Sequence, residues 1–130
     1  MFAYSPDQFR IIIDFILAEA KRVGASDAAA EISEGQGLSV TVRKGEVETI
    51  EQSVDKQVGV SVYLGQRRGN ASTSDFSPDS LRLTVEAAFH IAQHTAEDDC
   101  AGLAQSDLLE QNPQDLDVFY PWDLDAKEAI

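Results

Sequence analysis

The stretch between residues 38 and 74 restricts the possible folds of this chain more than any other part of its sequence. Apolar and polar residues alternate in its two clearest runs, which begin at Leu38 and at Val58. A period of two places each apolar set on one face of an extended strand. Short polar segments separate the runs, so the stretch predicts consecutive antiparallel strands that bury one face of a sheet.

About five strands are expected from this pattern, each bounded by residues that favour turns. Gly35-Gln36-Gly37 and Asp55-Lys56 are predicted breaks, and Lys44-Gly45 and Gly65-Gln66-Arg67 are predicted hairpin loops. The predicted strands cover residues 27–34, 38–43, 46–54, 57–64 and 68–73.

Two predicted helices flank the strands, and both begin with the same three residues. Ser5-Pro6-Asp7 and Ser77-Pro78-Asp79 each place a capping serine before a proline, and Gln8 can complete a capping box at the first. Apolar residues then recur at helical spacing. They are Phe9, Ile12, Ile13, Ile16, Leu17, Ala20 and Val23 in the first segment and Leu81, Val85, Ala88, Phe89 and Ala92 in the second. We therefore expect an α+β fold, a two-layer sandwich in which two helices cover one face of an about five-stranded, mainly antiparallel sheet.

The charge balance changes near residue 96. Residues 1–96 carry 13 acidic and 9 basic side chains, a net charge of −4, whereas residues 97–130 carry 10 acidic side chains and one lysine, a net charge of −9. We predict a first domain over residues 1–96 and an acidic arm or linker over residues 97–130 that contains Phe119, Tyr120 and Trp122. The whole chain has a net charge of −13, and such an acidic surface repels the phosphate backbone of nucleic acids. Direct nucleic-acid binding is therefore not expected.

The composition also bears on location and on the chain's end. No apolar run approaches the roughly 20 residues that span a membrane, and the N-terminus lacks the order of a secretory signal. Cys100 is the single cysteine and cannot form an internal disulfide. We expect a cytoplasmic protein without membrane contact. Asp125 with Glu128 indicates a helix that starts at the very end, so we expect Ile130 to be an artificial or proteolytic boundary with more protein downstream.

His90 and His94 are the chain's two histidines and lie four residues apart on the second predicted helix. This spacing brings both rings to one side, as a pair of metal ligands requires, so a zinc site with a third ligand is one hypothesis. The alternative is a solvated helix face near Glu86 and Glu97 that binds no metal. The sequence favours this alternative, because Ile91 stands where an H-E-x-x-H motif needs its glutamate.

Arg67 and Arg68 form a basic pair against an acidic background, and Asn70 follows in the last predicted strand. Guanidinium groups can clamp carboxylates, so these three residues are candidate contacts for a peptide or a partner; ordinary loop charge is the alternative. If this polar strand is a sheet edge, it can accept an extended peptide by main-chain pairing. No catalytic residue is predicted, because the chain lacks a G-x-S-x-G elbow and a phosphate loop, and acids beside Cys100 oppose thiolate formation.

Several runs of the chain point to a known family. They are LSVTVRKGEVETIE from Leu38 to Glu51, GVSVYLG from Gly59 to Gly65, RGNASTSDF from Arg68 to Phe76, AEDDCAGL from Ala96 and YPWDL from Tyr120. Together these runs resemble the first domain of the TldD/PmbA family, and most closely that of its PmbA (TldE) branch. The motifs are structural rather than catalytic.

The resemblance implies a bacterial cytosolic zinc metallopeptidase assembled from TldD and PmbA subunits as a heterodimer. It implies processing of small or unfolded peptides, such as antitoxins and leader-bearing peptide antibiotics, and related proteins are described as modulators of DNA gyrase. The family's zinc motif, H-E-x-x-x-H, belongs to the TldD branch and lies beyond the first domain. The resemblance therefore places zinc in a TldD-like partner subunit and no cofactor in this chain. Its implied role is structural, or the binding of peptide or partner; a non-enzymatic protein-interaction module is the alternative.

Overall fold

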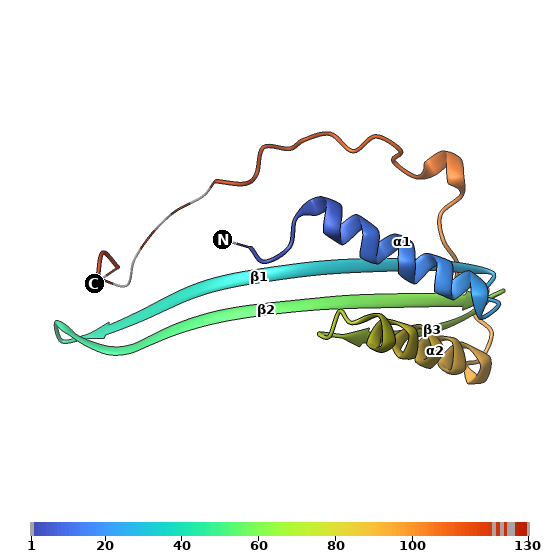
Figure 1. The fold of residues 1–130 in the computed structure, drawn as a ribbon, viewed down its shortest axis with the longest axis horizontal. Coiled ribbons are helices and arrows are strands. Elements are labelled where there is room, and N and C mark those ends of the chain that lie inside the picture. The colour runs from blue at the N-terminus through green and yellow to red at the C-terminus, as the bar shows by residue number, and fades with distance from the viewer. Residues whose placement is uncertain (1, 121, 123, 125–126, 130) are drawn as a thin grey trace. The chain divides into compact units, whose positions relative to one another are not determined.

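The computed structural model describes residues 2–120, 122, 124 and 127–129. In chain order the elements are helix α1 (Pro6–Arg22), strands β1 (Asp27–Arg43), β2 (Glu46–Leu64) and β3 (Arg67–Thr73), helix α2 (Pro78–His94) and a short 3-10 helix η1 (Ser106–Leu108) (Figure 1). Within the described residues the three strands form one antiparallel sheet in the order β1-β2-β3. The predicted α+β class is confirmed, and the predicted number of about five strands is wrong.

Two predicted breaks lie inside the long strands β1 and β2, which is why five predicted strands become three. A Cβ atom added at Gly35 would lie 2.7 Å from Oδ1 of Asp55, and one at Gly37 would lie 2.8 Å from Oγ of Ser53. Neither glycine has a positive φ. These glycines therefore make room for side chains of the opposite strand instead of turning the chain.

Both predicted hairpin loops are confirmed. Lys44 and Gly45 have φ values of 53° and 81°, as the two central residues of a type I′ turn require. Gly65 has a φ of 60°, which suits the first central position of a type II′ turn. The second loop is shorter than expected, because Arg67 already belongs to β3 and pairs with Leu64.

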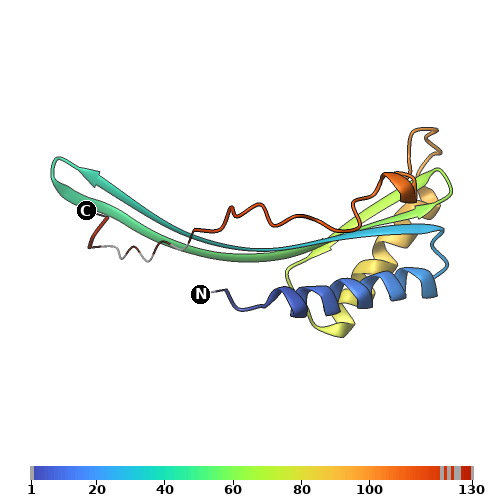
Figure 2. The same cartoon turned by 90° about the horizontal axis from the view of Figure 1, so that it is seen from above.

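A core of apolar side chains joins both helices to one face of the sheet. Its buried members are Ile16, Ala20, Val58, Val60, Val62, Leu81, Val85 and Ala88. The three valines alternate along β2 and therefore share one face. Because α1 and α2 both contribute to this cluster, they cover the same face of the sheet, as predicted (Figure 2). Burying a side chain of this size contributes about 1.5–3 kcal/mol to stability.

Helix α2 lies along β3 from end to end. At one end Nη1 of Arg67 donates to the carbonyl oxygen of Gln93 at 3.5 Å, and at the other Oγ1 of Thr73 lies 3.2 Å from Oγ of Ser80. Between them a Cβ added at Gly69 would collide with the carbonyl oxygen of Ala88. Glycine is therefore required for helix and strand to approach so closely.

The side chain of Lys56 holds the segment that precedes α1 through contacts with two aromatic rings, those of Tyr4 and Phe76. Nζ of Lys56 lies 5.1 Å from the ring centre of Tyr4 and 4.8 Å from that of Phe76, and it donates to the Tyr4 hydroxyl at 3.2 Å. The two rings are themselves in contact, with centres 5.2 Å apart. We call these three residues the Lys56 clamp; it ties the N-terminal segment and the loop before α2 to β2.

Both helices start as predicted. The N–H of Ser5 donates to Oε1 of Gln8 at 2.8 Å, and the N–H of Gln8 donates to Oγ of Ser5 at 3.3 Å, which closes the capping box. At α2, Oγ of Ser77 accepts the N–H of Ser80 at 3.4 Å. The carboxylate of Asp75 in turn accepts the N–H and the hydroxyl of Ser77 at 2.9 and 3.0 Å. These bonds to its charged form lower the pKa of Asp75.

The chain divides into two compact units. The first comprises Met1–Gly35 and Asp55–Leu103 and contains both helices, β3 and the core; the second comprises Gln36–Val54 and Ala104–Ile130. In the second unit Nη1 of Arg43 lies 3.5 Å from Oε1 of Glu48, beside the type I′ turn. The predicted boundary at residue 96 stays a prediction, and the predicted helix start at Asp125 lies outside the described residues. None of the described helices is long and apolar enough to cross a membrane.

Gly69→Ala should destabilise the protein by about 1–3 kcal/mol, because the added methyl group must displace the backbone of α2. Gly59→Ala is the matched control, since nothing lies within 4 Å of a Cβ added at Gly59 on β2. Urea unfolding followed by circular dichroism measures both changes. Equal midpoints for the two variants would contradict the close contact between α2 and β3.

Asp75→Asn should lower the free energy of unfolding at neutral pH and change it little at low pH. The pKa of Asp75 is depressed in the folded state. Its contribution is therefore present above the unfolded-state pKa and is lost as the pH falls through the folded-state pKa. Urea midpoints of wild type and variant across the acidic range check this. A gap between the two proteins that does not shrink on acidification would refute it.

Candidate functional site

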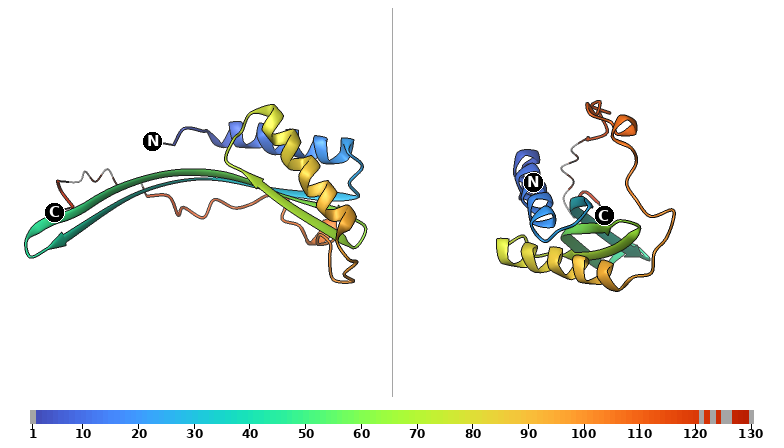
Figure 3. Two further views of the ribbon diagram at one scale, coloured as in Figure 1. Left: turned by 90° about the horizontal axis from the view of Figure 1, so that it is seen from below. Right: turned by 90° about the vertical axis from the view of Figure 1, so that its right-hand side faces the viewer.

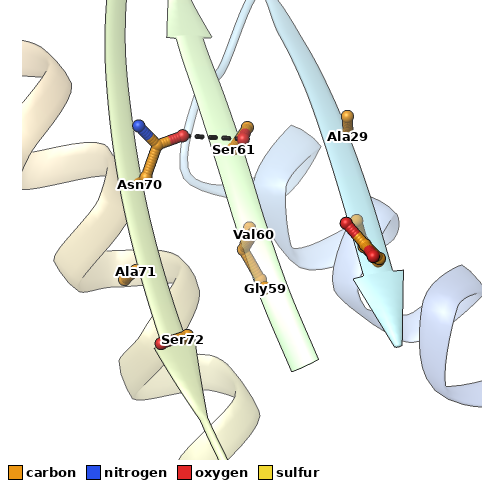
Figure 4. A pocket seen from close by; sticks show the side chains of 9 residues that line it. Ala29, Gly59, Val60, Ser61, Asn70, Ala71 and Ser72 are labelled. Carbon is orange, nitrogen blue, oxygen red and sulfur yellow. Dashed lines mark hydrogen bonds between the residues drawn. The ribbon is translucent and has the colours of Figure 1, made fainter. Parts of the chain in front are cut away.

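The face of the sheet opposite α1 and α2, here called the helix-free face because neither of these two helices covers it, carries a shallow trough of about 540 Å³ that crosses all three strands (Figure 4). Small side chains line it, among them Ala29 of β1, Gly59 and Ser61 of β2, and Ser72 of β3. Gly59 and Ser61 alternate with the buried valines of β2 and so face away from the core. The trough therefore leaves the backbone of the sheet open to a flat or extended ligand.

The polar groups of the trough are suited to binding a ligand. Oγ of Ser61 donates to Oδ1 of Asn70 at 2.7 Å across the β2–β3 pair (Figure 4). Glu31 is the one charged residue among those that line the trough. The hydroxyl and amide groups of this arrangement can hold a ligand by hydrogen bonds.

The structure separates the two predicted contact arginines. The guanidinium group of Arg67 lies 3.2 Å from Oε1 of Glu97 and also reaches the carbonyl oxygen of Gln93, near the C-terminus of α2. Arg68 is exposed and has no ion-pair partner within the described part of the chain. Because residues two apart in a strand share a face, Arg68 and Asn70 lie on the helix-free side. A contact role for these residues stays a prediction.

His90 and His94 are exposed on α2. Nδ1 of His90 lies 3.1 Å from Oε1 of Gln93, and both histidines border an open hollow of about 410 Å³ together with Ile91 and Thr95. Across the residues that the structure describes, no group of three His, Cys, Asp or Glu side chains is placed to hold a metal ion. The third ligand that the zinc hypothesis requires is therefore not found there.

Strand β3 is an edge strand, as the sequence hypothesis required. Leu64 and Arg67 flank the two-residue turn, and in such a hairpin the backbones of the flanking residues bond to each other. The backbone N–H and C=O groups of Arg67 and of every second residue after it therefore point toward β2. The N–H and C=O groups of the intervening residues, Arg68, Asn70 and Ser72, consequently point away from the sheet. None of these groups forms a backbone hydrogen bond elsewhere in the described chain.

An apolar strip on α2 lies beside this edge, and sequence reasoning missed it. Leu83 is 66% exposed and Ile91 is 47% exposed, and Ala87 lies between them at a spacing of four. The other flank of α2 faces α1, since the guanidinium group of Arg82 lies 5.3 Å from the ring centre of Phe15. The strip therefore faces away from α1, on the side of the open β3 edge. The spacing of four residues between these apolar side chains was the sequence signal that could have revealed the strip.

The predicted acidic arm also exposes apolar side chains. Leu116, Val118, Tyr120 and Trp122 are 74%, 78%, 74% and 81% exposed. Pro121, which belongs to the same predicted aromatic cluster, lies outside the described residues. Exposed apolar residues this close in sequence indicate a contact surface rather than a core.

Comparison with known proteins gives a consistent result. Residues 28–92 match the family described as PmbA/TldA metallopeptidase domain 1. The chain is 41% identical over 122 residues to a metalloprotease PmbA homolog of Haemophilus influenzae, covering 94% of this chain and 27% of that protein. It is 43% identical over 114 residues to metalloprotease PmbA of Escherichia coli O157:H7, covering 88% of this chain and 25% of that protein. The chain thus spans about a quarter of the length of these relatives.

Two solved structures share the fold. A putative modulator of DNA gyrase from Bacteroides thetaiotaomicron superposes with a TM-score of 0.75 at 15% sequence identity, over 85% of this chain and 25% of that one. TldE from Thermococcus kodakarensis superposes with a TM-score of 0.67 at 12% identity, over 79% of this chain and 23% of that one. At such low identity these similarities establish the fold alone.

Arg67→Ala should lower the stability of the chain by about 0.2–1 kcal/mol, because an exposed ion pair and a contact with the end of α2 are lost together. Arg68→Ala is the matched control and should leave stability unchanged. Thermal unfolding at equal protein concentration distinguishes the two. An equal loss in both variants would show that Arg68 also has a structural partner.

Proposed function

This chain belongs to the PmbA/TldD family, and on that premise we propose that it is the first domain of a PmbA-type subunit of a zinc metallopeptidase that processes small or unfolded peptides. In this proposal the chain itself is not catalytic. It provides a rigid α+β platform that binds the partner subunit or the peptide. The whole assembly would act in the cytoplasm, on substrates such as antitoxins and the leaders of peptide antibiotics.

The observation that carries the proposal is the combination of family and site. The family match covers residues 28–92, which include the whole sheet except one residue of β1. The same region offers an open strand edge and a trough of small residues. Such a surface binds an extended chain, which is how a non-catalytic domain can contribute to peptide processing.

Zinc does not fit the described residues of this chain. His90 and His94 are two nitrogen donors on an exposed helix face, and no third donor is placed to complete a site with them in that part of the chain. A hydrolytic zinc site needs three protein ligands and an open position for water. We propose that the zinc of the assembly lies in a TldD-like partner that carries H-E-x-x-x-H, as the family resemblance implies.

A non-enzymatic interaction module is the second candidate function. The exposed apolar residues of the arm, Leu116, Val118 and Tyr120, favour it, because they suit recruitment of another protein without any role in hydrolysis. We propose a gyrase-related protein as one such partner, because the family resemblance implies proteins described as modulators of DNA gyrase. The two candidates differ in whether a zinc-bearing subunit accompanies the chain.

Affinity purification of the full-length protein from its own cells, with mass spectrometry and zinc analysis, tests the proposal. We expect a stoichiometric partner with an H-E-x-x-x-H motif and about one zinc ion per partner. Replacing His90 and His94 by alanine should leave the zinc content unchanged. A zinc-free protein without such a partner would exclude the peptidase-subunit role and leave the interaction module.

A further inference from the structure

We propose that the outer edge of β3 and the exposed flank of α2 form one groove, which binds an extended peptide as an antiparallel fourth strand of the sheet. We call it the β3–α2 groove and define it by Arg68, Asn70 and Ser72 on the strand and by Leu83, Ala87 and Ile91 on the helix. The inference deepens the proposed function and rests on it, because it identifies where this domain holds a peptide and which peptides suit the site.

The backbone of β3 determines the kind of ligand. Arg68, Asn70 and Ser72 each present an N–H and a C=O outward, spaced two residues apart along the strand. Only another extended backbone can bond to donors and acceptors in this pattern. An unpaired strand edge costs the free protein little stability, because water bonds to its backbone groups. These groups are nevertheless arranged to pair with another strand.

The helix supplies the second wall of the groove. α2 follows β3 along its length, as the contacts of Arg67 with Gln93 and of Thr73 with Ser80 show. At the middle of the strand, Cβ of Ile91 lies 3.0 Å from the position of a Cβ added at Gly69. Ile91 therefore stands at the border between the helix and the strand edge. Peptide side chains on this side of the sheet would meet the apolar strip of α2.

The two faces of the bound strand would meet different surroundings. Peptide residues directly opposite Arg68, Asn70 and Ser72 share the helix-free face with these polar side chains, because paired residues point the same way in an antiparallel sheet. The alternate peptide residues point toward α2. The groove therefore selects a segment in which apolar residues alternate with polar ones.

Charge complementarity refines this selection. Arg68 is an exposed cation without an ion-pair partner in the described part of the chain, whereas Arg67 is already paired with Glu97. A glutamate or aspartate at a polar position of the peptide can reach the guanidinium group of Arg68. A second copy of this chain is a poorer occupant, because each copy carries a net charge of −13 and two copies repel each other.

Binding of a fluorescein-labelled heptapeptide to the 130-residue chain tests the inference by fluorescence anisotropy. The peptide alternates valine with serine and carries glutamate at one polar position. We expect saturable binding that weakens about tenfold or more when the amides of the polar positions are N-methylated, since those N–H groups bond to β3. Methylation at the valine positions should have little effect, because their amides point away. Equal binding of the two methylated peptides would overturn strand addition.

Substitutions locate the site. Ile91→Lys should reduce affinity about tenfold, whereas Ile11→Lys, which changes an exposed isoleucine on α1, should leave it unchanged. Arg68→Ala should abolish the preference for the glutamate peptide over its glutamine analogue. Circular dichroism confirms that each variant is folded. Unchanged affinity in Ile91→Lys and a retained preference in Arg68→Ala would each overturn the assignment.

Analytical ultracentrifugation tests whether a second copy of the chain, instead of a peptide, occupies the groove. A dimer of the chain that dissociates in Ile91→Lys would show that a second copy fills the groove and would overturn the peptide assignment. The outcome is also distinct from that of the purification experiment. Peptide binding without a zinc-bearing partner would refute the peptidase-subunit role and support the β3–α2 groove. A zinc-bearing partner without peptide binding would support the peptidase-subunit role and refute the groove.

Discussion

The direct contact between α2 and β3 at Gly69 is the constraint on which the rest of the first compact unit depends. Because no side chain stands between them there, the helix lies low enough on the sheet for Leu81, Val85 and Ala88 to reach the valines of β2. The same contact aligns the helix with the edge strand. Helix α2 lies against β3 (Figure 3). The core and the proposed groove are thus two sides of one packing arrangement, because α2 buries Leu81, Val85 and Ala88 and exposes Leu83 and Ile91.

Local signals in the sequence were sufficient for the helices and the tight turns. A capping serine followed by proline, and glycine at a loop position that needs a positive φ, act within a few residues and need no knowledge of the rest of the chain. The glycines at 35 and 37 show where such signals fail. A glycine indicates either a turn or a close neighbour, and only the opposite strand, with Asp55 and Ser53, decides between them.

The candidate site was also predictable only where local sequence signals were sufficient. The polar composition of β3 marked it as an edge, and parity within the strand already separates Arg67 from Arg68. The sequence does not show that Arg67 is occupied by Glu97, because that pair links residues 30 positions apart. The strip on α2 was visible as a spacing of four, but its meaning depends on which flank of the helix meets α1, and this is a tertiary fact.

The Lys56 clamp has a consequence for the order in which the chain assembles. It joins Tyr4 to a residue 52 positions later, so a long loop of chain must close when it forms. Contacts between residues far apart in the sequence cost loop-closure entropy and form late in folding. We expect the segment before α1 to dock after the helices and the sheet have formed and to open before they do, so its amides should exchange with solvent earlier than theirs in a hydrogen-exchange experiment.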